Sequence, residues 1–314
     1  MLKIRSFKKG IDEAVFVDVF NACFEDYDDI RMMTLEDLGK MMEAPGYNAD
    51  GLFIAEWNGK PAGMVDAYAD RLDKQRNGII QFLGVFPEFR HKGIGKKLLE
   101  KALEAHRTRG TKIIDAWAQS NRLACTHLFS SLGFESVRVT SMMKRSLAGL
   151  GSHVAEAEAV SIREMRVNDD AEIALLNTLD NEAFREHFNY RPKSVEETRY
   201  ALFDMPWFKI QKVFFALAQD EPVGYVIAGV DVGLNDEKKV KYGWILDVGV
   251  LKPHRRRGIG ANMMLHSMRW LTSQQIEDVL LYVDDANPTG AKRLYESLGF
   301  TDARKNLIYR LSLA

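Results

Sequence analysis

The sequence has few cysteines, no long hydrophobic run and almost no net charge. Its two cysteines, Cys23 and Cys125, lack CxxC spacing, which argues against a disulfide scaffold and a cysteine-based zinc site, and we expect no metal. The longest apolar stretch, 223–232, is interrupted by Asp231 and is too short to cross a bilayer. The first ten residues lack the apolar core of a secretory signal. These absences predict a cytoplasmic protein with no membrane partner.

The charged residues are balanced, with 43 Lys and Arg against 44 Asp and Glu and a formal net charge of −1. This balance argues against a dedicated nucleic-acid binder, although it allows local basic loops. The 314 residues are 46% hydrophobic, so the chain can bury a substantial core and is not globally disordered. At about 150 residues per domain, the length favours two domains.

The two halves of the chain repeat each other. Three pairs of segments match in the same order: 53–63 with 214–224, 85–95 with 250–260, and 121–134 with 287–300. The spacing drifts from 161 through 165 to 166 residues, as small loop insertions in diverged copies produce. A period this long is typical of a duplicated domain and not of a solenoid. We therefore predict an N-terminal domain over 1–147 and a C-terminal domain over 161–314, joined by a linker of small residues over 148–160.

Hydrophobic periodicity predicts the elements of the first copy. Alternating or β-rich segments indicate strands, 3.6-residue spacing indicates helices, and Asn58-Gly59 is a strong hairpin signal. The expected strands are 2–7, 52–56, 62–68, 79–85, 113–117 and 137–144, and the expected helices are 11–24, 93–107 and 122–132. This order predicts an α/β fold with a mixed sheet and right-handed crossovers.

Each half carries a glycine-rich loop between an apolar strand and an amphipathic helix, RHKGIG over 90–95 and RRRGIG over 255–260. Glycines let the backbone approach a ligand closely, and the helix N-terminus offers unpaired N–H groups and a partial positive charge. With basic side chains beside it, the loop suits a pyrophosphate. The chain has no GxxxxGK(S/T) and lacks the third glycine of GxGxxG, so a Walker loop is excluded and a Rossmann site fits poorly. A helix that merely begins after a glycine turn is the alternative, which the repetition disfavours.

Arg-x-x-Gly-x-Gly after a strand resembles the coenzyme A pyrophosphate motif of the GNAT family of N-acetyltransferases. Both loops fit this motif, and 287–300 is similar to the family's late helix and the turn after it. The predicted element order also agrees with the family's fold, so the resemblance covers the chain twice. The tandem layout is distantly similar to that of the mycothiol synthases. The resemblance implies two tandem GNAT domains, an acetyl-CoA donor and a primary amine acceptor.

The resemblance also implies which residues contact coenzyme A. A gap between the two central strands would hold the pantetheine, and the Val250 N–H would stabilise the thioester oxyanion. In the second copy the contact residues would be Val248, Gly249, Val250, Arg255, Arg256, Arg257, Gly258, Ile259, Gly260, Ala261 and Asn287. The first copy retains the motif, so coenzyme A binding is also expected there, through Val85, Arg90, His91, Lys92, Gly93, Ile94, Gly95 and Lys96.

Two candidate catalytic residues distinguish the copies. Tyr295 matches the family position that protonates the leaving thiolate, where the first copy has Phe129. Packing alone would not require the hydroxyl, although a half-buried aromatic is the alternative. Asp247 lies in an apolar strand, where a carboxylate should face a cavity or a partner. It resembles the family's base, its counterpart is Phe82, and a salt bridge to a neighbouring Lys or Arg is the alternative.

These residues lead to the hypothesis of an acetyl-CoA-dependent N-acetyltransferase with its chemistry in the second copy and a catalytically degenerate first copy. The acceptor would be a small-molecule or peptide amine. Two alternatives stay open: acetylation of a protein N-terminus or lysine, and a non-catalytic protein that binds or senses acyl-CoA. We expect a monomer or homodimer and no nucleic acid partner.

Overall fold

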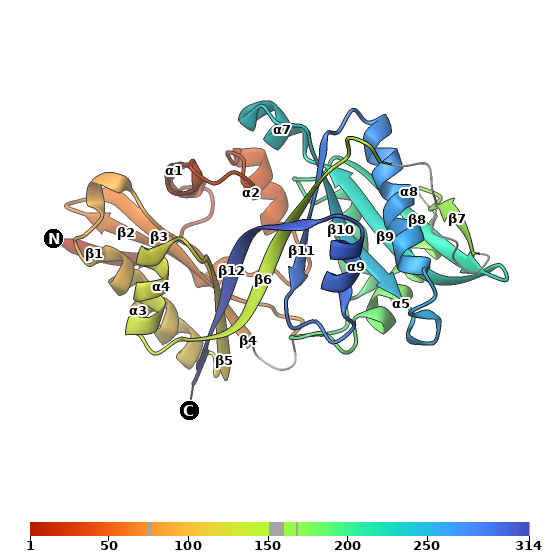
Figure 1. The fold of residues 1–314 in the computed structure, drawn as a ribbon. Helices are drawn as coiled ribbons and strands as arrows, with labels where there is room; N and C mark the ends of the chain where they lie inside the picture. The colour runs from red at the N-terminus through yellow and green to blue at the C-terminus, as the bar shows by residue number, and fades with distance from the viewer. Residues whose placement is uncertain (74–76, 151–159, 168, 314) are drawn as a thin grey trace. The chain divides into compact units, whose positions relative to one another are not determined.

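The computed structural model describes residues 1–73, 77–150, 160–167 and 169–313. It divides into two compact units, Met1–Val139 with Asn306–Ala314, and Thr140–Lys305. Each unit contains a mixed sheet with helices, so the predicted α/β class is confirmed (Figure 1). Most of the predicted linker, 151–159, lies outside the described residues.

Unit 1 contains a sheet in the order β1-β2-β3-β4-β5-β12. Its strands are β1 (Leu2–Ser6), β2 (Leu52–Trp57), β3 (Lys60–Ala69), β4 (Asn77–Val85), β5 (Ile113–Gln119) and the end of β12 (Thr301–Ser312). Its helices are α1 (Glu13–Phe24), α2 (Leu35–Met42), α3 (Ile94–Thr108) and α4 (Leu123–Ser131), with the 3-10 turns η1 (Ala49–Gly51) and η2 (Pro87–Phe89). The β4–β5 pair is parallel, as a crossover through α3 requires.

Unit 2 has the matching order β6-β11-β10-β9-β8-β7. Its strands are the end of β6 (Glu135–Ser146), β7 (Val160–Glu164), β8 (Ile210–Ala218), β9 (Glu221–Val230), β10 (Tyr242–Val250) and β11 (Asp278–Asp284). Its helices are α5 (Asp170–Ala183), α6 (Val195–Phe203), α7 (Val232–Lys238), α8 (Ile259–Ser273) and α9 (Ala291–Ser297), with the 3-10 turn η3 (Lys252–His254). Here β10 and β11 form the parallel pair.

The last strand of each sequence repeat completes the other unit. The end of β12 pairs with β5 from Asn306↔Gln119 to Ser312↔Ile113. The end of β6 pairs with β11 from Asp278↔Ser146 to Asp284↔Thr140. The compact units therefore differ from the sequence repeats in their last strands, because pairing with β5 or β11 is decided by tertiary contacts that repeat boundaries do not encode. The domain division into 1–147 and 161–314 stays a prediction.

Hydrophobic alternation places a helix on each face of the second sheet. On one face, Val226 and Ala228 of β9 pack with Met263 and Met264 of α8. On the other, Tyr225 of β9 belongs to the core formed with α5 and α6. Successive strand residues point to opposite faces, so β9 contributes to both cores.

Several local predictions hold, and three helices were missed. The hairpin at Asn58-Gly59 is confirmed, with φ values of 52° and 80°. The helix predicted over 93–107 is α3, whose Leu98, Leu99 and Ala102 are buried. Helices α2, α6 and α7 were not predicted, since they have only 8, 9 and 7 residues and hydrophobic periodicity is weak over so few turns.

Candidate active site

A gap between the parallel strands β10 and β11 forms the candidate site. Their pairing runs from Tyr242↔Asp278 to Ile245↔Leu281, whereas β10 continues to Val250 and β11 to Asp284. Next to the last pair, the register of β10 against β9 shifts between Ile245 and Asp247, and such a bulge bends the strand. A cavity of about 490 Å³ occupies this region.

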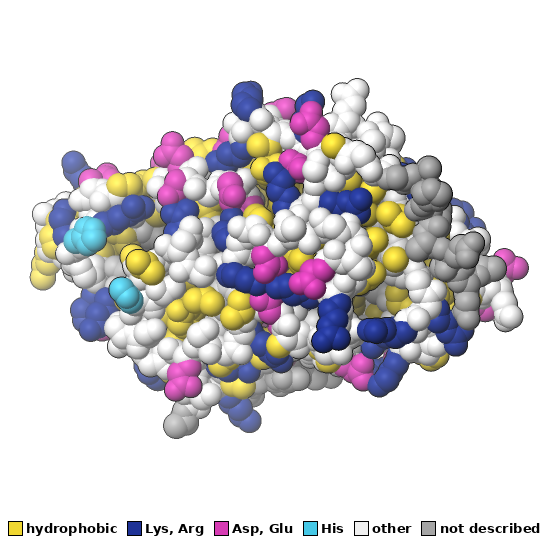
Figure 2. All heavy atoms as spheres, viewed as in Figure 1, with side chains coloured by type: hydrophobic (Ala, Val, Ile, Leu, Met, Phe, Trp, Pro, Cys, Tyr) yellow, Lys and Arg dark blue, Asp and Glu magenta, His cyan; other side chains and the backbone are white. Residues whose placement is uncertain are grey.

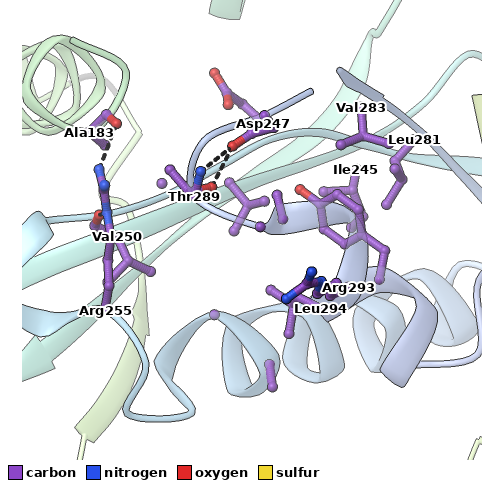
Figure 3. Close-up of a pocket in the computed structure, with 18 of the residues that line it drawn as sticks. Ala183, Ile245, Asp247, Val250, Arg255, Leu281, Val283, Thr289, Arg293 and Leu294 are labelled. Carbon is purple, nitrogen blue, oxygen red and sulfur yellow. Dashed lines mark hydrogen bonds between the residues drawn. The ribbon is translucent and has the colours of Figure 1, made fainter. Parts of the chain in front are cut away.

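The cavity is lined by most of the residues predicted in the second copy. Figure 3 shows Arg255, Val250 and Ala183 on one side, with Leu281, Val283 and Ile245 on the other. The predicted residues that line it are Asp247, Val248, Gly249, Val250, Arg255, Arg256, Gly258, Ile259, Gly260, Ala261, Asn287 and Tyr295. Arg257 was also predicted to contact coenzyme A, but it does not line the cavity.

The glycine-rich loop has a backbone that favours glycine. Gly258 precedes α8 with φ 78°, and Arg256 also has a positive φ, 65°. A Cβ on Gly260 would lie 3.1 Å from Leu294 Cδ2, so this glycine allows α8 to approach α9 closely. The first copy has the same backbone, with positive φ at His91 and Gly93. Both loops thus present a helix N-terminus, which attracts anions.

Arg255 anchors this loop to the protein itself. Its Nε donates to the Val250 carbonyl at 3.0 Å and its Nη2 to the Ala183 carbonyl at 3.0 Å, as Figure 3 shows. Its Nη1 also contacts Glu186 at 3.1 Å. In the first copy, Arg90 Nε donates to the Val85 carbonyl at 3.2 Å. The first arginine of each motif therefore ties its loop to the preceding strand.

The Val250 N–H points toward the gap. Leu251 N donates to the Val223 carbonyl of the preceding hairpin at 2.9 Å. Amides of successive strand residues point to opposite edges, so the Val250 N–H is directed to the edge where β10 and β11 separate. A backbone donor in this place can stabilise negative charge that develops in the cavity.

Tyr295 lies on α9 with its side chain 6% exposed, and it lines the cavity. Burial and the nearby Asp247 charge raise the pKa of its phenol. The hydroxyl therefore stays protonated at neutral pH and can donate a proton. Its counterpart Phe129 is also buried and packs against Phe134 and Tyr309.

Asp247 lines the same cavity, directly after the bulge. Burial raises the pKa of its carboxyl, the Lys193 ammonium lowers it and the nearby Asp180 charge raises it, and together they bring the pKa to about 7. A carboxyl that titrates near neutral pH is suited to act as a general base.

Three polar residues near Asp247 were missed by the sequence analysis. Tyr225 donates from its hydroxyl to Asp180 Oδ1 at 2.6 Å, and Lys193 Nζ lies 2.9 Å from Asp180 Oδ2. Tyr225 also lies on the same face of the sheet as Asp247, because Gly249 pairs with Tyr225 and Asp247 with Ile227. We call Asp180, Lys193 and Tyr225 the polar triad. Extending the repeat upstream would have found these residues, because Asn21 aligns with Asn181 and Thr34 with Ser194, each 160 residues apart.

Every member of this constellation has an apolar counterpart in the first copy. The counterparts follow from helix register, strand register and the repeated segments. Asp180, Lys193, Tyr225, Asp247 and Tyr295 correspond to Phe20, Met33, Met64, Phe82 and Phe129. Phe82 packs edge-on against Phe20, with ring centroids 5.9 Å apart. The first copy therefore replaces a titratable cluster by a hydrophobic one.

Other polar groups border the cavity. His187 and Asp284 line it, and the pKa of His187 is lowered by burial and by Arg255. Asp284 Oδ1 accepts from the Ala286 N–H at 2.9 Å, which favours a turn-forming role. Asn287 Oδ1 accepts from Thr289 N at 2.8 Å, so this predicted contact residue also orders the turn before α9.

Figure 2 shows Lys and Arg side chains intermixed with Asp and Glu over the face in view. Among the described residues, no group of three or more His, Cys, Asp or Glu side chains could hold a metal ion. Within that same part of the chain, every helix is too short or too polar to cross a membrane.

Comparison with known proteins supports the resemblance. The profile of the "Acetyltransferase (GNAT) family" matches residues 15–134 and 176–300. A mycothiol acetyltransferase of Thermobispora bispora is 31% identical over 228 residues, covering 73% of this chain and 74% of that protein. A mycothiol acetyltransferase of Actinosynnema mirum is 28% identical over 271 residues, with coverages of 85% and 86%. An N-alpha-acetyltransferase 30 of Xenopus laevis is 26% identical over 243 residues, with coverages of 76% and 82%.

Solved structures share the two-domain fold. A tandem GNAT protein from the clavulanic acid biosynthesis pathway has a TM-score of 0.74 at 14% identity, covering 99% of this chain and 98% of its own. A GNAT protein from Sphaerobacter thermophilus has a TM-score of 0.71 at 20% identity, with coverages of 99% and 95%. Together with the duplicated loops, these matches establish that the chain belongs to the GNAT family, with two tandem domains, and is an acetyl-CoA-dependent N-acetyltransferase.

Proposed function

We propose that unit 2 transfers the acetyl group of acetyl-CoA to the primary amine of a small molecule. One observation carries this proposal: Asp247 and Tyr295 line the same cavity, and both are replaced by phenylalanine in the first copy. The pyrophosphate of the donor would lie at the N-terminus of α8, held by the backbone of residues 256–261. Its pantetheine would follow the free edge of β10 at Val248 and Val250.

The proposed reaction proceeds by direct attack of the amine on the thioester. Asp247 accepts a proton from the acceptor ammonium, directly or through water, and the free amine nitrogen forms a bond to the acetyl carbonyl carbon. The Val250 N–H stabilises the tetrahedral oxyanion. The carbon–sulfur bond then breaks, Tyr295 donates its phenolic proton to the departing thiolate, and the nitrogen, now part of the amide, releases its second proton to water while Asp247 returns the first to solvent. Solvent returns a proton to the tyrosine.

A panel of amines with acetyl-CoA, followed by thiol release, tests the proposal. The panel should include the deacetylated amine form of mycothiol, since relatives carry that name. It should also include peptides with free N-termini, because the Xenopus relative is named as an N-alpha-acetyltransferase. Turnover of peptides alone would favour the protein-acetylation alternative, and binding of acetyl-CoA without turnover of any amine would favour a sensing role.

The pH dependence gives a second test. Because the pKa of Asp247 is raised to about 7 and the base works only when ionised, kcat/KM should rise as pH increases through about 7. Asp247→Asn should remove that rise, so the loss of activity should be largest above pH 7, where the carboxyl of the parent chain is ionised. An unchanged profile in Asp247→Asn would exclude Asp247 as the base.

A further inference from the structure

We propose that Lys193, Asp180 and Tyr225 are positioning residues that hold the Asp247 carboxylate in place and set the pH range over which it accepts a proton. This inference rests on the proposed function, in which Asp247 is the base. It adds three residues that do not touch the reacting atoms and act through Asp247.

The polar triad is built from three separate elements. Asp180 lies on α5, Tyr225 on β9, and Lys193 in the loop between α5 and α6. Tyr225 is fully buried and Asp180 is 6% exposed, whereas about half of the Lys193 side chain, 50%, is exposed. A buried carboxylate needs partners, and Asp180 has two, the Tyr225 hydroxyl and the Lys193 ammonium.

The Lys193 backbone is held firmly in place. Its N–H donates to Asn181 Oδ1 at 2.8 Å, and its carbonyl accepts from Asn181 Nδ2 at 2.9 Å. Asn177 Nδ2 donates to the same carbonyl at 3.0 Å. The Lys193 side chain therefore starts from a fixed backbone position, and its ammonium contacts Asp180. Asp180 in turn is bonded to Tyr225, which shares a face of the sheet with Asp247.

The first copy shows that the loop between the first two helices can form without these polar side chains. Asn21 clamps Met33 by the same pair of hydrogen bonds, of 3.0 and 2.7 Å. Met33 replaces Lys193 there, and Phe20 and Met64 replace Asp180 and Tyr225. Since a loop of the same shape forms around apolar side chains, the polar triad serves something other than the fold.

The charges around Asp247 predict opposite effects for two substitutions. Asp180 is a like charge that raises the pKa of Asp247, and Lys193 is an opposite charge that lowers it. The Tyr225 hydroxyl lowers it to a smaller extent by hydrogen bonding. Tyr295 also lines the cavity and is neutral at these pH values, because its pKa is raised, and the pKa of His187 is lowered by burial and by Arg255. Lys193 and Asp180 are therefore the charges that decide the Asp247 titration.

The experiment measures the Asp247 titration directly, without an acceptor. The full chain is labelled with ¹³C at the aspartate carboxyls, and the Asp247 signal is assigned by its loss in Asp247→Asn. Lys193→Met should raise the Asp247 midpoint by about one pH unit, the low end of the usual range for a nearby charge, because solvent reaches half of the lysine. Asp180→Asn should lower it by about one unit. Tyr225→Phe should raise it by less than Lys193→Met.

Activity on a confirmed acceptor should follow these shifts. In Lys193→Met the rise of kcat/KM with pH, which we call the acid limb, should move to higher pH. At pH 7 the ionised fraction of Asp247 should fall about fivefold. The affinity for acetyl-CoA should not change. Lys193→Arg restores the charge and should restore the limb. Met33→Leu, in the first copy, is the matched control and should leave both measurements unchanged.

The outcomes separate the two proposals. If Asp247→Asn removes the acid limb but Lys193→Met and Asp180→Asn leave the Asp247 midpoint unmoved, or move it in the same direction, the polar triad is structural and this inference is wrong. If the limb persists in Asp247→Asn, the base is another group, and both proposals fail.

Discussion

The loop that joins the first two helices is held in the same way in both units. An asparagine clamps it at Met33 in unit 1 and at Lys193 in unit 2. Each following helix begins with a capping box, at Thr34 and at Ser194. Between the copies, the residues that satisfy backbone groups are identical or chemically similar, whereas Lys193 and its polar partners are replaced by apolar residues. Backbone groups that lose partners on burial are costly in either copy, whereas a titratable cluster is useful only where chemistry occurs.

The two units also differ where the donor would lie. Ala183 and His187 beside the cavity correspond to Cys23 and Tyr27, and Pro288 corresponds to Arg122. Arg122 Nη1 donates to Asp26 at 2.6 Å, and its guanidinium lies 4.0 Å from the Tyr27 ring centroid. The first copy thus carries an ion pair and larger side chains than unit 2 has at the matching positions. The larger side chains and the ion pair leave less room for coenzyme A in the first copy, so they weaken the expectation that both motifs bind it.

The largest effect should come from Tyr295→Phe, which gives unit 2 the side chain found at Phe129. General-acid assistance is worth about 10²- to 10⁴-fold in rate, so turnover should fall by that factor while acetyl-CoA affinity stays within a few-fold. Steady-state kinetics and calorimetric titration measure the two quantities. Phe129→Leu is the control and should keep full turnover. Parent-like turnover in Tyr295→Phe would mean that water or another group supplies the proton.

Next in size is the effect of a bulky residue at the start of α8. Gly258 has a φ of 78°, and a side chain there strains the backbone and obstructs the approach of a phosphate. Losing charge-assisted hydrogen bonds to the phosphates should weaken coenzyme A binding about 10- to 100-fold in Gly258→Leu. Gly93→Leu, at φ 76° in the first copy, imposes equal strain and is the matched control. Wild-type affinity in Gly258→Leu would show that the loop assignment is wrong.

A smaller effect concerns the number of sites. With Arg122 paired to Asp26, we expect calorimetry to give one coenzyme A per chain, bound in unit 2. Arg122→Ala removes the ion pair and should allow weak binding at a second site through 90–96. Two equal sites in the parent chain would instead restore the simpler expectation from the duplicated motif.

The smallest effect is on stability and tests the exchanged strand. Arg310 of β12 donates to both oxygens of the buried Asp115 on β5, at 2.7 and 2.8 Å. Arg310→Ala leaves that carboxylate without these bonds and should lower the free energy of unfolding by about 2–3 kcal/mol. Urea denaturation measures this change, with Lys60→Ala at the exposed hairpin as the control. A change no larger than that of the control would argue against this pairing.

The sequence by itself determined several local features of the fold and of the candidate site. The duplication, the hairpin at Asn58-Gly59, the amphipathic α3 and both glycine-rich loops are local patterns, because turn geometry, helix periodicity and backbone approach to an anion depend on neighbouring residues. The same locality allowed Tyr295 and Asp247 to be compared with Phe129 and Phe82.

Only the tertiary structure decided the rest. The exchange of the last strands depends on which free edge, β5 or β11, each strand meets, and alternation along the strand is compatible with either. The contact among Asp180, Lys193 and Tyr225 joins a helix, a loop and a strand that are up to 45 residues apart. A buried carboxylate obtains its partners from whatever the fold brings within hydrogen-bond distance, and that distance is a property of packing rather than of sequence spacing.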